Sequence, residues 1–253
     1  MVKHAVVRRV SQKFQYGLTT SNLGKPNYNT AILQHSDYIE AMKKCGLKVK
    51  ILESDDRFPD STFVEDTAVV NKDFVVISNL GAPSRKGEEK DIKMMMEEFY
   101  NDIKSIEKPG TLEGGDVMKV ENIYFIGISK RTNKEGALQL KEILKKFDYT
   151  CSLVSLKDVL HLKTGVAYLG DNNIIASGEF IKNPLFKDYN IIEVEEDEHY
   201  ATNCIRVNEY VLIAKGFKKL KDSILGLGYK ILEIDMSEFR KMDGGLSCLS
   251  LRF

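Results

Sequence analysis

The 253-residue sequence lacks an excess of charge of either sign, because lysine plus arginine and aspartate plus glutamate both number 37. Such a balance argues against a broad contact with nucleic acid or with an anionic membrane. The sequence also has no run of about 18 apolar residues, and its N-terminal segment MVKHAVVRRV alternates like a strand instead of resembling a signal peptide. These absences predict a cytoplasmic protein whose partner is a small molecule.

Cysteine is scarce, with Cys45, Cys151, Cys204 and Cys248 scattered along the chain. No two cysteines have the Cys-x-x-Cys spacing and no histidine stands at a metal-ligand spacing, so no metal site is expected. Dispersed cysteines in a cytoplasmic chain do not indicate disulfides either, because that compartment keeps thiols reduced. Each cysteine is expected to be a small buried hydrophobe unless other residues mark it as reactive.

The sequence does contain a repeat, in which two strands are joined by a turn that carries Asn, Asp or Glu. This unit occurs at 66–79, 116–129, 165–178 and 203–216. After each hairpin we expect a helical segment and another strand, as in 134–156, where apolar residues favour one helical face. The C-terminal segment 244–253 begins a fifth hairpin, and the N-terminal strand, helix and strand complete that unit.

A ring of ββαβ units closed by the chain ends explains this pattern better than an open sheet, because closure leaves few unpaired strand edges. The sequence therefore predicts one domain, 1–253, with the α/β fold of a five-bladed propeller. The alternative is that several αβ segments look alike by chance. Residues 11–30 lack periodicity and contain Gly and Pro, and we expect them to form a lid loop over the site.

Polar residues that could carry chemistry stand beside turns at the strand ends. They include Asp60, Glu65, Asp66, Arg85, Glu113, Asp116, Arg131, His161 and Cys248. Equivalent positions of different propeller repeats face one axis, so residues far apart in the chain can form one site. Alone, Cys248 would be an ordinary strand cysteine and His161 a satisfied histidine. The two glycines before Cys248 favour a reactive residue, because they let backbone and ligand approach closely.

Six short motifs occur in one order along the chain: F-V-E-D, G-A-P-S-R, L-E-G-G-D, S-K-R-T-N, H-L-K and D-G-G-L-S-C. With these motifs the sequence resembles the dimethylarginine dimethylaminohydrolase family over its full length. That family belongs to a wider group of guanidine-modifying enzymes with arginine deiminase and the amidinotransferases. The resemblance implies the same five-fold ββαβ propeller.

The resemblance also implies three catalytic roles: Cys248 is the nucleophile, His161 the proton donor and general base, and Glu113 the carboxylate that orients His161. A thiol is only a few per cent thiolate at neutral pH, and a nearby cation raises that fraction. Either His161 or the substrate guanidinium could be this cation. We expect a covalent thiouronium that water hydrolyses to a ureido product such as citrulline, without a metal or cofactor.

A guanidinium is a planar cation that donates hydrogen bonds, so its site needs carboxylates that accept them. Asp66 is the leading candidate, with Glu65 beside it. At the other end of the substrate, the resemblance places Asp60 near the α-amino group. It also places the main-chain carbonyls of Leu18 and Met242 against that group.

The substrate α-carboxylate is implied to bind Arg85 and Arg131, so that opposite charges hold both ends of the molecule. The first covalent step would be the same in an arginine deiminase, a citrulline hydrolase or an amidinotransferase. Arginine deiminases carry an additional helical domain for which this chain has no room, which favours a dimethylarginine hydrolase. The alternative from another class is a non-catalytic propeller that only binds a partner. A homodimer is a possible assembly.

Overall fold

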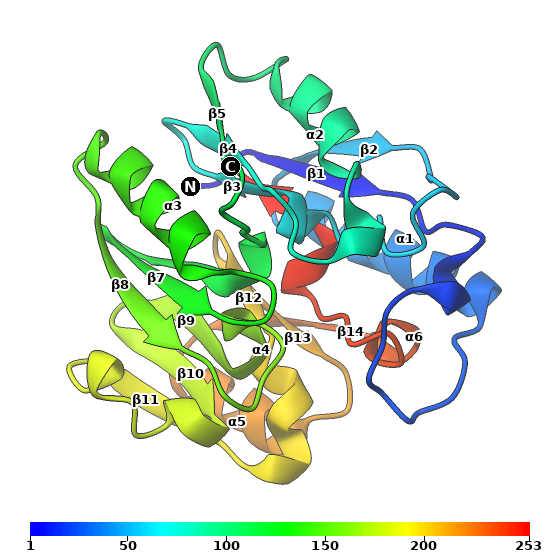
Figure 1. The fold of residues 1–253 in the computed structure, drawn as a ribbon. Helices are drawn as coiled ribbons and strands as arrows, with labels where there is room; N and C mark the ends of the chain where they lie inside the picture. The colour runs from blue at the N-terminus through cyan, green and yellow to red at the C-terminus, as the bar shows by residue number, and fades with distance from the viewer.

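The structure, a computed structural model, describes all 253 residues. Its strands form five small sheets of three strands each, and Figure 1 shows the longer helices around the outside of these sheets. The sheets are β15–β1–β2 (Leu251–Arg252, His4–Arg8, Lys48–Leu52), β3–β4–β5 (Ala68–Val70, Val75–Ile77, Ile103–Ser105), β6–β7–β8 (Val117–Val120, Ile123–Ile128, Thr150–Ser155), β9–β10–β11 (Val166–Gly170, Asn173–Ser177, Asn190–Val194) and β12–β13–β14 (Ile205–Val207, Tyr210–Ala214, Lys230–Ile234).

All five sheets have the same topology. The middle strand is antiparallel to one neighbour, with which it forms a hairpin in four of the sheets, and parallel to the other. The predicted hairpins are thus confirmed. Their turns place Glu121, Asn172 and Asn208 at positive φ, a conformation that asparagine and aspartate adopt more readily than most residues.

The first sheet joins the two ends of the chain, as predicted. β15 pairs with β1 through Ala5 with Arg252 and Val6 with Leu251, and β1 pairs in parallel with β2. In the other repeats, the strand just before the middle strand in the sequence is its antiparallel partner. In the first sheet the C-terminal strand β15 is this partner. Residues near the end of the chain are therefore fixed to the first strand.

Helices connect the middle strand to the parallel strand in four repeats: α1 (Tyr28–Lys44), α2 (Glu89–Met96), α3 (Lys134–Lys145) and α5 (Lys218–Gly226). The side chains of Asn27 and Asn133 cap α1 and α3 by accepting hydrogen bonds from main-chain N–H groups of the first turn. The expectation of a helix after hairpin 165–178 was wrong. Two short 3₁₀ turns, η5 (Gly178–Phe180) and η6 (Pro184–Phe186), replace it, because Gly178 and Pro184 interrupt a short connection.

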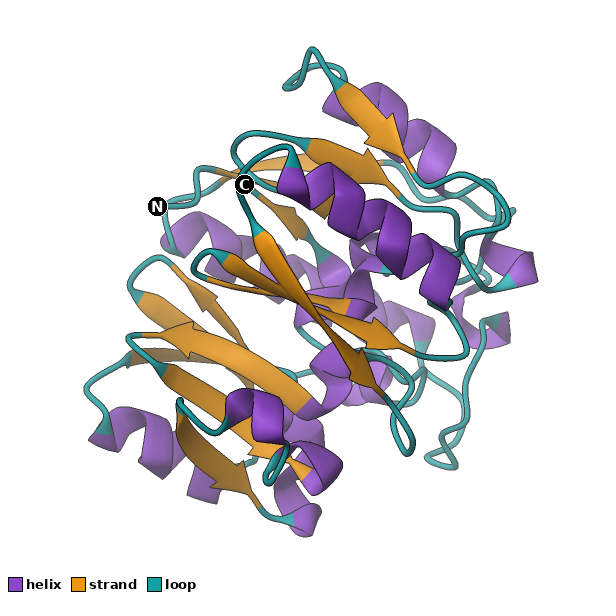
Figure 2. Cartoon of the chain, turned by 60° about the vertical axis from the view of Figure 1, so that its left-hand side comes forward, coloured by secondary structure: helices purple, strands orange, loops and turns teal.

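Buried apolar residues form five clusters, and each cluster joins two sheets. Val6 of β1 packs with residues of β3 and β4, whereas its neighbours Ala5 and Val7 pack with residues of β12 and β13. Successive side chains of a strand point to opposite faces, so one strand contributes to two clusters. In Figure 2 the longer helices lie outside the strands that provide these residues.

The first strand of every sheet, counting β15 for the sheet of the chain ends, lines one shared cavity of about 320 Å³. At one end of these strands the chain makes five short helical turns: η2 (Val64–Thr67), η4 (Gly114–Asp116), α4 (Leu162–Gly165), η7 (Glu196–Thr202) and η8 (Ser247–Leu249). The remaining short helices are η1 (Phe14–Tyr16), η3 (Pro83–Arg85) and α6 (Ser237–Arg240). No helix has both the length and the apolar character needed to span a membrane.

Candidate active site

Most of the predicted residues line one small cavity of about 40 Å³, and three of them, Asp66, His161 and Cys248, lie in or beside the turns before the first strands of the sheets. Its lining consists of Leu18, Asp60, Phe63, Asp66, Arg85, Arg131, Leu160, His161, Met242, Asp243, Gly244 and Cys248. Two of the predicted residues, Glu65 and Glu113, do not line it. Phe63, Leu160 and Asp243 line it although sequence reasoning assigned them no contact: Phe63 and Asp243 open the motifs F-V-E-D and D-G-G-L-S-C, and Leu160 is an ordinary apolar residue before His161.

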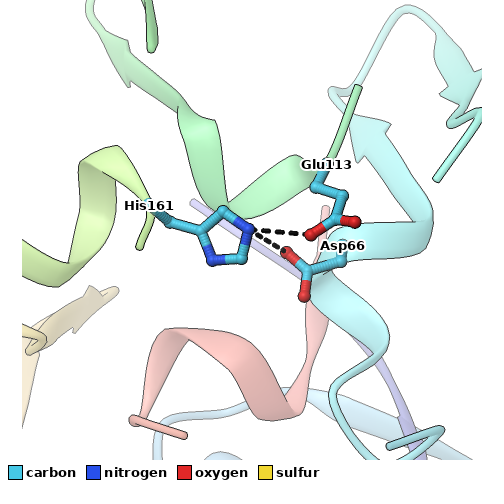
Figure 3. Close-up of side chains that lie close together, drawn as sticks. All are labelled: Asp66, Glu113 and His161. Atoms are coloured by element: carbon cyan, nitrogen blue, oxygen red, sulfur yellow. Dashed lines mark hydrogen bonds and ion pairs between the residues drawn. The ribbon is translucent and has the colours of Figure 1, made fainter. Parts of the chain in front are cut away.

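The imidazole of His161 faces two carboxylates, as Figure 3 shows. Its Nε2 atom lies 2.8 Å from Oε2 of Glu113 and 3.9 Å from Oδ1 of Asp66. Burial alone would lower the pKa of His161, but the charges of Asp66, Asp116 and Glu113 outweigh it and raise the pKa to about 9. His161 is therefore protonated at neutral pH and can donate a proton.

Glu113 is fully buried behind His161 and is satisfied on both oxygens. Oε1 accepts hydrogen bonds from the main-chain N–H groups of Gly81 and Ala82 at 3.1 and 3.0 Å, while Oε2 faces His161. Burial would raise the pKa of Glu113, but the hydrogen bond from His161 contributes to a net lowering. Glu113 can thus hold the imidazole in place as an anion without reaching the cavity.

The packing around His161 explains why residue 115 of the motif L-E-G-G-D is a glycine. A Cβ atom on Gly115 would lie 2.8 Å from Oδ1 of Asp66 and 2.9 Å from Cγ of His161, closer than real Cβ atoms approach. Asp116, which follows, accepts the main-chain N–H of Leu162 at 3.0 Å and so fixes the turn that carries His161. The motif therefore supports the histidine from both sides.

Cys248 lies in the turn η8 before β15 and not within a strand. The main-chain N–H of Gly245 points to its Sγ atom at 3.4 Å. Burial raises the pKa of the Cys248 thiol to about 12, and the carboxylates of Glu65 and Asp66 act in the same direction. The thiol is protonated in the free protein, and a cationic ligand beside it would favour the thiolate.

The two glycines before Cys248, Gly244 and Gly245, are packed closely against side chains of the protein. A Cβ atom on Gly244 would lie 2.2 Å from the ring of Phe63, and one on Gly245 would lie 2.5 Å from the amide of Asn203. The expectation that the glycines give a ligand room is thus corrected in part. They allow close backbone approach, but what approaches is Phe63 and Asn203. The other cysteines are free thiols, with Cys45 and Cys204 buried and Cys151 half-buried.

Asp66 and Arg85 form a buried ion pair, with Nη1 of Arg85 2.6 Å from Oδ2 of Asp66. Burial would raise the pKa of Asp66, but His161 and Arg85 outweigh it and lower the pKa to about 2. Arg85 also donates to Glu88 through Nε and Nη2 and to the carbonyl of Phe63 at 2.9 Å. These contacts occupy most of its N–H groups, so little of Arg85 is left for a substrate carboxylate.

Arg131 is the more available arginine of the cavity, because its one ion pair is a long contact of 3.5 Å to Oε1 of Glu113. Asp66, Glu113 and His161 also offer ligand atoms within 4.8 Å of one another, a spacing compatible with a metal ion. In this cavity Arg85 and protonated His161 already supply the positive charge that the two carboxylates require.

The predicted lid loop 11–30 is shorter than expected, because residues 28–30 already belong to α1, and its residue Leu18 lines the cavity. The main-chain N–H of Leu18 donates to both oxygens of Asp60 at 3.1 Å, and Thr20 donates to Asp243 through its main-chain N–H and its hydroxyl. The carbonyls of Leu18 and Met242 accept no hydrogen bond from the protein. Leu18, Met242 and Asp60 all line the cavity.

Glu65 points away from the cavity that its neighbour Asp66 lines. Its carboxylate accepts the hydroxyl of Ser247 at 2.6 Å and pairs with Lys163, and Arg252 lies at 3.5 Å. Glu65 instead lines the larger cavity between the inner strands. Adjacent residues of a short turn face different directions, which the sequence pair Glu65-Asp66 does not reveal.

A protein-family model for eukaryotic N,N dimethylarginine dimethylhydrolase matches residues 9–250. The N(G),N(G)-dimethylarginine dimethylaminohydrolase of Pseudomonas aeruginosa is 48% identical to this chain, and the alignment covers 100% of each. This chain belongs to the dimethylarginine dimethylaminohydrolase family. The predicted resemblance is thereby confirmed over the full length.

Solved structures of dimethylarginine dimethylaminohydrolases have the same fold. A Cys-to-Ser mutant of the Pseudomonas aeruginosa enzyme complexed with citrulline has a TM-score of 0.99 and 47% identity, covering 100% of each chain. A His-to-Gly mutant of a dimethylarginine dimethylaminohydrolase, as an adduct with S-methyl-L-thiocitrulline, has a TM-score of 0.98 and 47% identity, also covering 100% of each. The mixed α/β architecture of this chain is therefore that of the dimethylarginine dimethylaminohydrolase family.

Proposed function

We propose that this protein hydrolyses Nω-methylated arginines, converting dimethylarginine to citrulline and dimethylamine through a covalent intermediate on Cys248. The observation that carries the proposal is the one cavity that contains a thiol and a protonated histidine, with a buried carboxylate on the histidine. A propeller that only binds a partner does not require this combination. Family membership, with a 48% identical relative of the same name, supports the proposal.

Catalysis begins when the substrate guanidinium enters beside the Cys248 thiol and lowers its pKa, so that the thiol proton leaves to solvent. The thiolate then forms a carbon–sulfur bond to the guanidinium carbon. The tetrahedral adduct collapses by breaking the carbon–nitrogen bond to dimethylamine, which takes a proton from His161. An S-alkylthiouronium remains on Cys248.

Hydrolysis returns the enzyme to its starting state. Neutral His161 removes a proton from water as the water oxygen attacks the same carbon. The carbon–sulfur bond breaks, and the hydroxyl proton that came from water passes to the sulfur, which leaves citrulline and the Cys248 thiol. Glu113 holds the imidazole in both steps, because its Oε2 atom lies 2.8 Å from Nε2.

The substrate is oriented by opposite charges at its two ends. Asp66, an anion beside His161 and Arg85, receives the guanidinium. Asp60 and the free carbonyls of Leu18 and Met242 receive the α-ammonium group, and Arg131 binds the α-carboxylate.

Three further features belong to the proposal. The loop before α1 acts as a lid, which its hydrogen bonds to Asp60 and Asp243 support. The five sheets form one closed five-bladed propeller and a single domain, which the apolar cluster between the last sheet and the first supports. The protein is cytoplasmic, which four free thiols support. Homodimer formation stays a prediction, to be tested by sedimentation.

The proposal is tested by incubating the protein with arginine, monomethylarginine, asymmetric dimethylarginine and citrulline, and by measuring ureido product and released amine. We expect the highest kcat/KM with asymmetric dimethylarginine, and loss of at least about 10³-fold in kcat for Cys248→Ser. Mass spectrometry of acid-quenched enzyme should find the adduct on the Cys248 peptide. Highest activity with arginine would indicate a deiminase instead, and inactivity with all four compounds would favour the binding scaffold.

A further inference from the structure

The five turns before the first strands of the sheets do not contribute equally to the proposed site. Asp66, Glu113, His161 and Cys248 lie in or beside four of the five turns, and each has a role in the proposed reaction. The fifth turn, η7, is followed directly by Asn203, to which that reaction assigns no role. Asn203 is nevertheless buried, with 8% of its surface exposed.

The Asn203 amide joins the turn of the nucleophile to the helix that follows His161. Its Oδ1 atom accepts the main-chain N–H of Ser247 at 2.9 Å. Its Nδ2 atom donates to the hydroxyl of Ser247 at 3.1 Å and to the main-chain carbonyl of Lys163 at 3.0 Å. Ser247 directly precedes Cys248, and Lys163 lies two residues after His161, so one side chain bridges both segments.

Glu65 closes this bridge from a fourth repeat. The Ser247 hydroxyl donates to its Oε2 atom at 2.6 Å, and the ammonium group of Lys163 donates to its Oε1 atom. A buried carboxylate must be paired or hydrogen-bonded, and these two partners of Glu65 come from the two segments that Asn203 bridges, while a third partner, Arg252, lies at 3.5 Å. Gly245 leaves room for the arrangement, since a Cβ atom there would lie 2.5 Å from the Asn203 amide.

We propose that Asn203, Ser247 and Glu65 are positioning residues that hold the Cys248 turn against the His161 helix without touching the substrate. This proposal rests on the hydrolase function proposed above. It gives Glu65 a role other than the predicted substrate contact, because its carboxylate faces away from the cavity with Cys248 and His161. Nucleophile and proton donor come from different repeats, and a misplacement of about 1 Å between reacting groups can cost roughly 100-fold in rate.

The test compares Asn203→Ala, Ser247→Ala and Glu65→Gln with the wild type. We expect kcat to fall roughly 10- to 100-fold in each, while KM for asymmetric dimethylarginine changes less than about threefold, because the substrate contacts remain. Ser247→Thr keeps the hydroxyl and should restore most of kcat. In the double variant of Glu65→Gln with Ser247→Ala, the loss should be smaller than the product of the single losses, since both remove one hydrogen bond.

Asn71→Ala is the matched control. Asn71 is also a buried asparagine, and its side chain donates to the hydroxyl of Tyr124 in another part of the fold. This variant should lose stability but keep kcat per folded molecule, measured by circular dichroism and activity together. Wild-type kcat in folded Asn203→Ala and Ser247→Ala would overturn the proposal, and so would a raised KM with unchanged kcat in Glu65→Gln.

A readout without substrate separates this proposal from the function itself. Release of the turn exposes the Cys248 thiol, so iodoacetamide should alkylate it at least about threefold faster in Asn203→Ala and Ser247→Ala than in Asn71→Ala. Equal rates would overturn the positioning role. A wild type that converts none of the four guanidino and ureido compounds, but gives the expected alkylation rates, would contradict only the proposed hydrolase.

Discussion

At the scale of single residues, the site depends on how burial and charge oppose each other. His161 and Cys248 line the same cavity, yet the pKa of His161 is raised to about 9 and that of Cys248 to about 12. Both residues therefore start in their protonated forms. The histidine is ready to donate a proton, whereas the thiol requires a cation before it can act as a nucleophile.

Replacing Glu113 should move the alkaline limb of the pH–rate profile. The first step requires protonated His161, so kcat/KM should fall as the pH rises through about 9. Glu113→Gln removes one of the charges that raise this pKa, and the fall should occur at lower pH. The buried carboxylate Glu198, which caps α5, gives the control Glu198→Gln. If kcat/KM fell at the same pH in Glu113→Gln and in the wild type, the assigned pairing of Glu113 with His161 would be contradicted.

The same histidine links stability to pH. Its pKa in the folded protein lies above its ordinary value of 6.5, so the proton binds more tightly to the folded than to the unfolded chain. This contribution to the free energy of unfolding is fully present below pH 6.5 and is lost as the pH rises through about 9. The difference in Tm between wild type and His161→Gly should therefore depend on pH across this window, as measured by thermal denaturation.

The Cys248 thiol should distinguish a neutral from a cationic alkylating reagent. With a pKa of about 12, it should react slowly with iodoacetamide at neutral pH. A chloroacetamidine carries the charge of a guanidinium and should react at least about tenfold faster, relative to the rates of both reagents with a free thiol. Mass spectrometry of the Cys248 peptide measures both rates. The preference should weaken in Asp66→Asn, because the anion that receives the cation is removed.

At the scale of elements, the sequence predicted the hairpins, three of the connecting helices between them, the helix of the chain ends and the shared first sheet. Their strands alternate or run apolar, and their turns contain asparagine, aspartate or glutamate, so local signals suffice. The missing helix after β10 shows the opposite case, because a short connection with Gly178 and Pro184 has little helical periodicity to detect. The direction of Glu65 was equally hidden, since it depends on Ser247 and Lys163 from other repeats.

The lid loop should depend on its contact with the turn that follows α6. Asp243 accepts two hydrogen bonds from Thr20 and has a φ of 56°, which glycine also tolerates. Asp243→Gly should therefore keep the backbone but release the loop, raising KM about tenfold through the loss of charged hydrogen bonds. We expect a smaller change in kcat and faster limited proteolysis within residues 11–27. Unchanged KM and proteolysis would contradict the role as a lid.

At the scale of the whole molecule, the repeated ββαβ unit brings residues that are distant in the sequence into one site. The sequence pattern predicted that turns of different repeats converge, and the cavity contains residues from Leu18 to Cys248. The pattern could not predict which polar side chains form hydrogen bonds or ion pairs with one another. Arg85 illustrates the limit, because its pairing with Asp66 and Glu88 follows from three-dimensional packing and from no motif.

The pairing of the chain ends should couple stability to activity. Leu251 of β15 is 2% exposed, packs with Val6 and Val64, and lies three residues after Cys248. Leu251→Ala should cost about 2–5 kcal/mol of unfolding free energy, as truncation of a buried leucine does, and the loosened strand should displace the Cys248 turn. We therefore expect kcat per folded molecule to fall as well.

Leu140→Ala separates the two effects. Leu140 is a fully buried residue of α3, within the cluster that joins the second and third sheets and includes no residue of the catalytic cavity. Its truncation should cost a similar free energy of unfolding, about 2–5 kcal/mol, but leave kcat per folded molecule near the wild-type value. Urea denaturation gives the free energies, and turnover of asymmetric dimethylarginine at the same folded concentration gives the rates. If both variants kept full kcat, the pairing of β15 with β1 would serve stability alone, and the position of Cys248 would be fixed by its own turn.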